Sequence, residues 1–386
     1  MSKKTFHQLV QSIRFDDATK RLETSAIAPV RETFQSFVTN CKGAYSPGFY
    51  VTIDEMLESF RGRCRFRQYI VNKPAKYGIK IYALVDSRTF FTSNLEMYAG
   101  KQPEGPFQVK NDAASVVMPL IEPSKTGRNV TTDNYFTSVL LANTLMENHR
   151  LTLIGTVRKN KPQIPRELLE VKGGPVMSTM FAYGKKPNNC LLVSYVPKPN
   201  KNVLLLSTLH NDDKIDERTG EACKPEVITD YNFTKGGVDV VDKMKAEYSV
   251  TRFSNRWPFT IFCSLLNIST INSQIIFREN TNTVLTRRHY ILELSKQLAM
   301  PHLCRRSKIH TLPYQLSQRI RNITGKRAVP NLNLPGEAKV RCEFCPLRKY
   351  RFTQRHCSNC QSPICKEHTA VSTLTCCQCL GNDENV

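Results

Sequence analysis

Four aspartates are placed where a metal-dependent phosphodiester reaction could use them. Asp86 ends the apolar run IKIYALV, and Asp133 follows a short strand-like run and precedes a helical one. Asp239 and Asp242 are three residues apart, which puts both on one face of a helix. Hydrolysis and strand transfer proceed by in-line displacement at phosphorus, where two Mg²⁺ ions can activate the attacking oxygen and stabilise the leaving one. Mg²⁺ prefers carboxylate oxygens, so these four acids would be an adequate ligand set if they converge.

Each of these acids also has a structural explanation. Aspartate after a strand is a common turn residue, which would suffice for Asp86. Asp133 could cap the helix that begins near Tyr135, and Asp239 could lie in a first helical turn, where the helix dipole favours it. Spacing alone therefore leaves both interpretations open.

The C-terminal stretch has the pattern of a zinc-binding module. The chain has 14 cysteines, and most of those beyond residue 340 fall into pairs with a two-residue spacer, a spacing that lets both side chains reach one zinc ion. Spacing does not fix which pairs share an ion, and we expect a cross-brace with two ions, which leaves Cys377 spare. The first predicted ligand set is Cys342, Cys345, Cys365 and His368, and the second is Cys357, Cys360, Cys376 and Cys379.

A module of about 40 residues cannot bury enough core alone, so metal binding should supply its folding free energy, on the order of 10–16 kcal/mol. Such a cross-brace also resembles RING and PHD modules. A ubiquitin-ligase or histone-reading role is therefore an alternative, although the 340 residues before the module argue against it as the main function.

Composition indicates a globular protein with a polyanionic partner. The 386-residue chain has a formal net charge of +22, for which DNA or RNA is the first candidate partner. The hydrophobic content of 40% is enough for a core, and the length predicts roughly two to three structural units. The N-terminal segment lacks the apolar run of a signal peptide, and residues 261–277 carry polar residues throughout, so we predict a buried helix and no membrane span. The remaining cysteines are scattered singly, which favours a reducing compartment.

The order of predicted elements suits an α/β protein with an RNase H-like core, in which acids from the first strand, the fourth strand and a later helix converge. Residues 1–80 are predicted to be mainly helical, with a basic stretch at their end. Residues 160–225 alternate short β runs with Pro and Gly turns, which predicts an inserted small β unit. The other predicted elements are strands at 79–85, 90–97, 129–132 and 151–157, and helices at 112–121, 135–147, 238–250 and 257–279.

At these residues the chain resembles the piggyBac transposase family, in family order and over essentially its whole length. The matching segments are TIDEMLESFRGRCRFRQYIVNKPAKYGIKIYALVDS (52–87), TTDNYFTS (131–138), LTLIGTVRKNKPQIP (151–165), YNFTKGGVDVVDKM (231–244), NRWPFTIF (255–262) and the cysteine pairs.

The resemblance implies a catalytic DDD motif at Asp86, Asp133 and Asp239, with Asp242 as an additional carboxylate and two Mg²⁺ or Mn²⁺ ions as cofactors. It implies an enzyme that cuts DNA at the transposon terminal repeats, forms hairpins and joins the ends to TTAA targets. It further implies a homodimer that acts in the nucleus and has no membrane partner. The family carries a long N-terminal region before the segment matching Met1, so the resemblance implies a chain that begins within the first DNA-binding segment.

The implied organisation is an RNase H-like core interrupted by an insertion and flanked by helical segments for dimerisation and DNA binding. The expected parts are 1–80 (helical, first part), 81–159 (catalytic core), 160–225 (insertion), 226–248 (last core helix), 249–330 (helical, second part), 331–339 (linker) and 340–380 (zinc domain).

Several basic or aromatic residues could contact DNA. Arg158 and Lys161 match basic positions that lie near target DNA in the family, although a solvated turn would also explain them. Trp257 could stack on an unpaired base or pack in the core. Arginines that could bind phosphates, or be ordinary surface charge, are Arg61, Arg63, Arg65 and Arg67.

The alternative function is a domesticated, catalytically inactive protein derived from a transposase, which binds DNA or chromatin through its basic surfaces and zinc domain. The presence of all four acids favours the enzyme over this alternative.

Overall fold

The computed structural model divides the chain into two compact units, Met1–Arg288 and His289–Val386. The structure describes residues 2–20, 26–100, 113–122, 126–170, 175–185, 190–309, 311–325, 339–346, 348–357 and 362–370.

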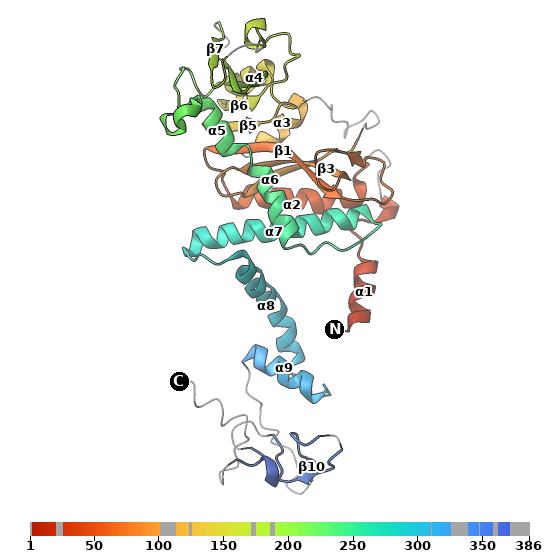
Figure 1. The fold of residues 1–386 in the computed structure, drawn as a ribbon. Coiled ribbons are helices and arrows are strands. Elements are labelled where there is room, and N and C mark those ends of the chain that lie inside the picture. The colour runs from red at the N-terminus through yellow and green to blue at the C-terminus, as the bar shows by residue number, and fades with distance from the viewer. Residues whose placement is uncertain are drawn as a thin grey trace. The chain divides into compact units, whose positions relative to one another are not determined.

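The first unit is built on a nine-stranded mixed sheet (Figure 1). Its order is β2-β3-β1-β5-β6-β9-β8-β7, with β4 also paired to β3. The central pairs β1–β5 and β5–β6 are parallel, and the other pairs are antiparallel. The strands are β1 (Tyr50–Ser59), β2 (Gln68–Tyr69), β3 (Tyr77–Asp86), β4 (Thr92–Met97), β5 (Asn129–Thr132), β6 (Thr152–Thr156), β7 (Thr179–Tyr183), β8 (Leu191–Lys198) and β9 (Lys201–Ser207).

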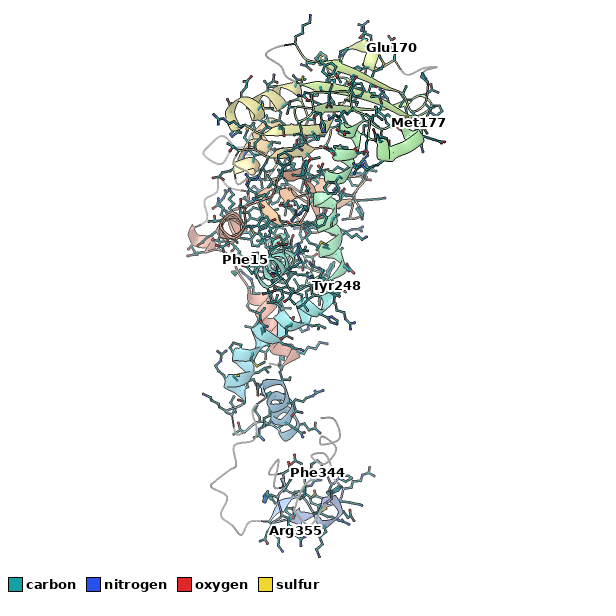
Figure 2. All side chains as sticks on the ribbon, turned by 90° about the vertical axis from the view of Figure 1, so that its left-hand side faces the viewer. Phe15, Glu170, Met177, Tyr248, Phe344 and Arg355 are labelled. Atoms are coloured by element: carbon teal, nitrogen blue, oxygen red, sulfur yellow. The ribbon has the colours of Figure 1, made fainter. Side chains whose placement is uncertain are left out.

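Helices cover both faces of this sheet. On one face α2, α6 and α7 share a core with β1, β3 and β4, and on the other α3 and α4 share a core with β1, β5 and β6. A third, smaller core packs α5 on β6, β8 and β9. Side chains fill the layers between sheet and helices throughout this unit (Figure 2). The helices are α1 (Lys3–Ser12), α2 (Arg31–Ala44), α3 (Ala113–Ile121), α4 (Val139–His149), α5 (Glu226–Thr234), α6 (Gly237–Glu247) and α7 (Trp257–Thr281).

Strand β1 lies at the centre of the sheet and contributes to both cores. Successive side chains of a strand point to opposite faces, so Ile53 enters the core under α3 and α4, whereas Met56 enters the core under α2, α6 and α7. Thr52 and Asp54 are an even number of residues from Met56 and share its face. The sheet thus turns Asp54 toward α6.

Helix α7 is long and apolar enough to cross a membrane by length and composition alone. However, 61% of its most apolar window is buried inside the structure, and Ile261, Leu265 and Ile268 pack in the core that it shares with α2 and α6. The helix therefore has the burial of a core helix, which agrees with the prediction for residues 261–277.

Two expectations about the fold need correction. The helical prediction for residues 1–80 holds for α1 and α2 but is wrong for residues 50–59, which form the central strand β1. Residues 160–225 are β-rich as predicted, but strand β9 pairs with β6, so β7, β8 and β9 extend the central sheet instead of forming a separate unit. The mixed α/β class with an RNase H-like core is confirmed.

The second unit contains most of α8 (Arg287–Arg306), then α9 (Tyr314–Thr324) and the two-stranded sheet of β10 (Val340–Arg341) and β11 (Phe352–Thr353). A 3-10 turn, Lys366–His368, follows this sheet. The hairpin and the turn carry the described part of the cysteine-rich module.

Candidate active site and zinc centre

Asp54 and Asp133 lie on neighbouring parallel strands. Ile53 pairs with Thr132 in the β1–β5 register, so the next residue of each strand is an aspartate. Neighbouring strands are about 4.8 Å apart, which places the two acids close together. Asp133 Oδ1 also accepts the N–H of Tyr135 at 2.9 Å, which stabilises the turn after β5, whereas Ser138 caps α4, which begins at Val139.

Helix α6 runs along β1 in the same direction. At its start, Gly237 packs so closely on Thr52 that a Cβ there would lie 2.7 Å from the Thr52 Oγ1. Near its end, the buried Lys245 places its Nζ 3.5 Å from the sulfur of Met56. Asp54 lies between these two contacts on β1, and therefore faces the middle of α6.

Asp239 and Asp242 are on the part of α6 that passes Asp54. Lys73, from the turn between β2 and β3, connects the two elements, because its Nζ donates to Asp239 Oδ1 at 3.2 Å and to the carbonyl oxygen of Glu55 at 2.8 Å. Asp242 Oδ1 is 2.9 Å from Lys245 Nζ. Three acids predicted from the sequence, Asp133, Asp239 and Asp242, thus gather around Asp54.

Three acids of this cluster, Asp54, Asp133 and Asp242, lie in a buried environment, whereas the side chain of Asp239 is 67% exposed. Burial, and next the adjacent carboxylate of Glu55, raise the pKa of Asp54 to about 8. Burial likewise raises the pKa of Asp133 and of Asp242, the latter in spite of its ion pair with Lys245. Carboxylate oxygens are the donors that Mg²⁺ prefers, so the residue types of this cluster suit a divalent cation.

Asp86 does not belong to this cluster, which corrects its assignment from the sequence. In the antiparallel β1–β3 register Asp86 pairs with Val51, three residues before Asp54. Its side chain is 1% exposed, and each carboxylate oxygen accepts two hydrogen bonds. The donors are the N–H groups of Arg88 and Thr89 to Oδ1, and the N–H of Gly48 and the hydroxyl of Tyr45 to Oδ2. Asp86 therefore organises the turn after β3, the structural role that the sequence left open.

The sequence contained a signal for Asp54 that the element prediction missed. Asp54 stands in TIDEMLESF, inside the longest segment that resembles the piggyBac family. If residues 50–59 are taken as the first core strand, Asp54 becomes a candidate for the acid at the first-strand position.

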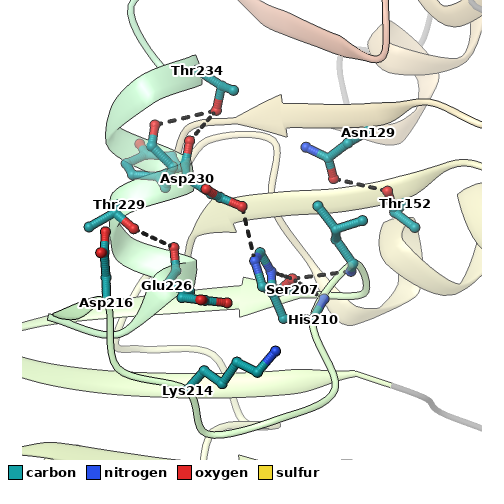
Figure 3. A network of polar contacts seen from close by, with 12 residues as sticks. Asn129, Thr152, Ser207, His210, Lys214, Asp216, Glu226, Thr229, Asp230 and Thr234 are labelled. Atoms are coloured by element: carbon teal, nitrogen blue, oxygen red, sulfur yellow. Dashed lines mark hydrogen bonds and ion pairs between the residues drawn. The ribbon is translucent and has the colours of Figure 1, made fainter. Parts of the chain in front are cut away.

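A polar network joins β9 to α5, the helix that directly precedes α6 (Figure 3). His210 joins β9 to α5, because Nδ1 is 2.9 Å from Ser207 Oγ and Nε2 is 3.1 Å from Asp230 Oδ2. At the end of α5, Thr234 then accepts from the Thr52 hydroxyl through its carbonyl oxygen at 2.6 Å. Although Ser207, His210 and Asp230 have the residue types of a hydrolase triad, the serine is 0% exposed and its oxygen accepts two backbone N–H groups, so the network is structural.

We expect Gly237→Ala to disturb the cluster. The new methyl group would meet Thr52 Oγ1 at 2.7 Å and Cβ at 3.0 Å, which forces α6 away from β1. Overpacking of this kind costs about 1–3 kcal/mol, and the displaced Asp239 should reduce DNA cleavage as well. Denaturant unfolding and a cleavage assay measure the two effects.

The matched control is Gly236→Ala, where an added Cβ meets no atom within 4 Å. Alanine is a poorer N-cap than glycine, which lowers stability, but it also reduces the entropy of the unfolded chain, which raises stability. The free energy of unfolding of Gly236→Ala should therefore change by less than about 0.5 kcal/mol. Equal behaviour of the two variants would show that close packing at Gly237 does not position the helix.

Of the predicted DNA contacts, the arginine stretch after β1 surrounds a pocket of about 700 Å³ that Asn255 also lines. Arg67 donates to the carbonyl oxygens of Arg61 and Gly62, at 2.8 and 3.0 Å, and so shapes the loop. The lining arginines are Arg61, Arg63, Arg65 and Arg67, all exposed.

The other three predicted contacts differ in their surroundings. Arg158 is exposed beside the cluster, with its guanidinium 5.7 Å from the ring of Tyr135 and a favourable electrostatic interaction with Asp133. Lys161 lies in the same turn and is half-buried. Trp257 packs edge to face on Phe66, with ring centroids 5.1 Å apart, which is the core-packing alternative.

In the C-terminal module four side chains form a potential metal site. The ligand atoms of Cys342, Cys345, Cys365 and His368 all lie within 4.8 Å of one another. The sulfur–sulfur distance between Cys345 and Cys365 is 3.7 Å, and His368 Nδ1 is 3.3–3.7 Å from the three sulfurs. A zinc tetrahedron with bonds of about 2.0–2.3 Å has edges of about 3.5–3.8 Å. The first predicted ligand set is therefore assembled with dimensions that suit zinc.

The second predicted ligand set cannot be compared in this way. Cys357 is described and buried, whereas Cys360, Cys376 and Cys379, together with the spare Cys377, lie outside the described residues. The second zinc site stays a prediction.

The α/β fold and the cluster of acids are those of an enzyme that acts on phosphodiesters, and comparison with known proteins agrees with this class. The family described as Transposase IS4 matches residues 1–274, and transposases are enzymes that cut and join DNA. The cryo-EM structure of a piggyBac transposase synaptic complex with hairpin DNA is similar at 36% sequence identity and a TM-score of 0.80. The similarity covers 98% of this chain and 80% of that chain. The chain belongs to the piggyBac transposase family.

Proposed function

We propose that the chain is a metal-dependent DNA transposase whose catalytic carboxylates are Asp54, Asp133 and Asp239, with Asp242 as an additional acid. The observation that carries this proposal is the meeting of acids from β1 and α6 around the Lys73 ammonium group, with Asp133 next to Asp54 at the end of the neighbouring strand β5. Asp239 has a side chain that is 67% exposed, which leaves the cluster open to a large substrate.

A pair of divalent cations, Mg²⁺ or Mn²⁺, would supply activation of the attacking oxygen and stabilisation of the leaving oxygen. The chain's own residues position these groups. Asp54 and Asp133 are held by the sheet, and Asp239 and Asp242 by a helix whose start is tied to β1 through Thr52. Arg158 would contact a phosphate near the cluster, which its exposure and its interaction with Asp133 support.

The substrate we propose is duplex DNA with the terminal repeats of a transposon, joined to TTAA targets. The net charge of +22 and the exposed arginines around the pocket after β1 support a polyanionic substrate. The similar solved complex contains hairpin DNA, which supports a hairpin intermediate here. We further propose that the protein acts as a homodimer in the nucleus.

The C-terminal module is proposed to bind zinc through Cys342, Cys345, Cys365 and His368, and to contact the transposon ends. Its tetrahedral ligand geometry supports the ion, and three thiolates with one imidazole are a usual structural zinc set.

An excision assay tests the proposed function. The DNA that flanks the reading frame is placed around a reporter, and the chain is expressed with it. Precise excision that restores a single TTAA, and that disappears in Asp54→Asn, is the expected result. Reporter loss that persists in Asp54→Asn would refute the catalytic assignment, and DNA binding without excision would favour the inactive, domesticated protein.

A further inference from the structure

Lys73 is a cationic side chain in the middle of the acidic cluster. The turn that carries it is held by hydrogen bonds from the Ile70 N–H to the Lys76 carbonyl oxygen at 2.8 Å and from the Lys76 N–H to the Lys73 carbonyl oxygen at 3.0 Å. Its side chain is only 16% exposed. Because its Nζ bonds both the Glu55 carbonyl oxygen and Asp239 Oδ1, the ammonium joins β1 to α6.

The surroundings of this ammonium are those of a bound cation. It interacts favourably with Asp54, Asp239 and Asp242, which come from two different elements. Burial of an unpaired lysine is costly, and so is the crowding of several carboxylates. Here the carboxylates compensate the buried ammonium, and the ammonium reduces the repulsion between the carboxylates. This positive charge lies where the proposed function requires a divalent cation.

Lys245 and Arg158 are cations at the edges of the cluster. Lys245 is buried behind it and pairs with Glu58 and Asp242. Arg158 donates to Asn134 at 3.4 Å and stands outside Asp133. Of the side-chain hydrogen bonds within the described ranges, the one that reaches the Asp239 carboxylate comes from Lys73.

We infer that Lys73 is a positioning residue, whose ammonium holds the acidic cluster together in the absence of a divalent cation and competes with that cation for the same carboxylates. This inference rests on the proposed function, because it treats the cluster as a cation site. If Lys73 has this role, a divalent cation must displace the ammonium from Asp239 before it binds. The protein would then bind the cation more weakly than the same carboxylates would without Lys73.

Binding of Mn²⁺ to the full chain, without DNA, tests the inference. The signal of free Mn²⁺ in electron paramagnetic resonance gives the dissociation constant for the zinc-loaded protein. Because a neighbouring unit charge changes such equilibria by about tenfold or more, Lys73→Met should bind Mn²⁺ at least about tenfold more tightly than the wild type. Lys73→Gln, which keeps a donor for the Glu55 carbonyl oxygen, should do the same and provides a second variant if the first does not fold.

Lys76→Met is the matched control, because it removes the same charge from an exposed position in the same turn. Its Mn²⁺ affinity should equal that of the wild type. A second readout is thermal unfolding without metal, in which Lys73→Met melts below the wild type and Mn²⁺ restores it, whereas Lys73→Arg melts like the wild type.

Failure of the inference about Lys73 and failure of the proposed function give different results. If Lys73→Met binds Mn²⁺ no more tightly than the wild type, while Asp54→Asn abolishes binding, the role of Lys73 is refuted and the proposed function stands. If the wild type and Asp54→Asn bind Mn²⁺ equally, the cluster is not the cation site, and the proposed function is refuted with it.

Discussion

Asp54→Asn is expected to lose DNA cleavage while it keeps its fold, whereas Asp86→Asn is expected to lose stability and to lose cleavage only as far as it unfolds. Asp54 stands between Asp133 on β5 and Asp239 on α6, where a cation would be held. Loss of one group that stabilises transition-state charge costs about 10²–10³-fold in rate, and we expect at least this for Asp54→Asn. DNA binding should stay near the wild-type value, because it depends on basic residues elsewhere.

The two variants should also differ in stability. Burial raises the pKa of Asp54, so the folded state disfavours its ionised form, and a neutral Asn of the same shape should not lower the melting temperature. Asp86 accepts two hydrogen bonds at each oxygen. In Asp86→Asn the new amide nitrogen would face two of these donors, and the variant should therefore lose about 2–5 kcal/mol.

A cleavage assay on labelled DNA and denaturant unfolding measure both variants side by side. Loss of activity in Asp86→Asn should follow its loss of folded protein, and should diminish at lower temperature. A stable but inactive Asp86→Asn together with an active Asp54→Asn would restore the assignment made from the sequence.

The choice between these two acids shows what the sequence could predict about the site. Asp239 and Asp242 were predictable because a spacing of three residues in one helix determines a shared face. Asp133 was predictable because it follows a short strand-like run and precedes a helical one. Which further acid meets them depends on strand pairing, and pairing between segments far apart in the chain is not visible in local composition.

Strand β1 was missed for a related physical reason. Its burial on both faces of the sheet removes the alternation that marks a half-buried strand. The residues of TIDEMLES include several good helix formers, so local propensity favoured a helix that tertiary packing overrides. Helix α7, by contrast, was predictable, since its apolar pattern is longer than any strand.

Zinc ligation was the most predictable chemistry, because short spacers within each pair make it local. Four ligands predicted for one ion do meet, although the pairing of Cys342 and Cys345 with the later Cys365 and His368 was one of several possibilities. The extension of the central sheet by β7, β8 and β9 was not predictable in the same way, since it depends on the distant pairing of β9 with β6.

Removal of zinc is expected to unfold the C-terminal module and leave the first unit folded. In the described part of the module the apolar cluster consists of Cys342, Cys345 and Cys365 with Phe344 packed against them, so we expect metal binding to supply most of its stability, on the order of 10–16 kcal/mol. The first unit has three apolar cores of its own, which do not depend on the metal. A strong chelator should therefore abolish protection from hydrogen exchange in residues 339–346, 348–357 and 362–370, and leave the central sheet of the first unit protected.

Variants of His368 separate ligation from packing. His368→Ala should reduce the zinc content measured by native mass spectrometry by one ion per chain, and should unfold the module. His368→Cys should keep that ion, because zinc accepts a fourth thiolate as readily as an imidazole. Cys304→Ser is the matched control, since this cysteine lies in α8 and outside the ligand cluster, and its zinc content should be unchanged.

The contrast between the two His368 variants is what makes the test decisive. A structural role for the imidazole ring, such as its contact with Phe344 at 6.0 Å between ring centroids, would be lost in both variants. Retention of zinc and exchange protection in His368→Cys alone can come only from coordination. Equal loss in both variants would show that the ring packs and does not bind the metal, and the ligand set would then need a different fourth member.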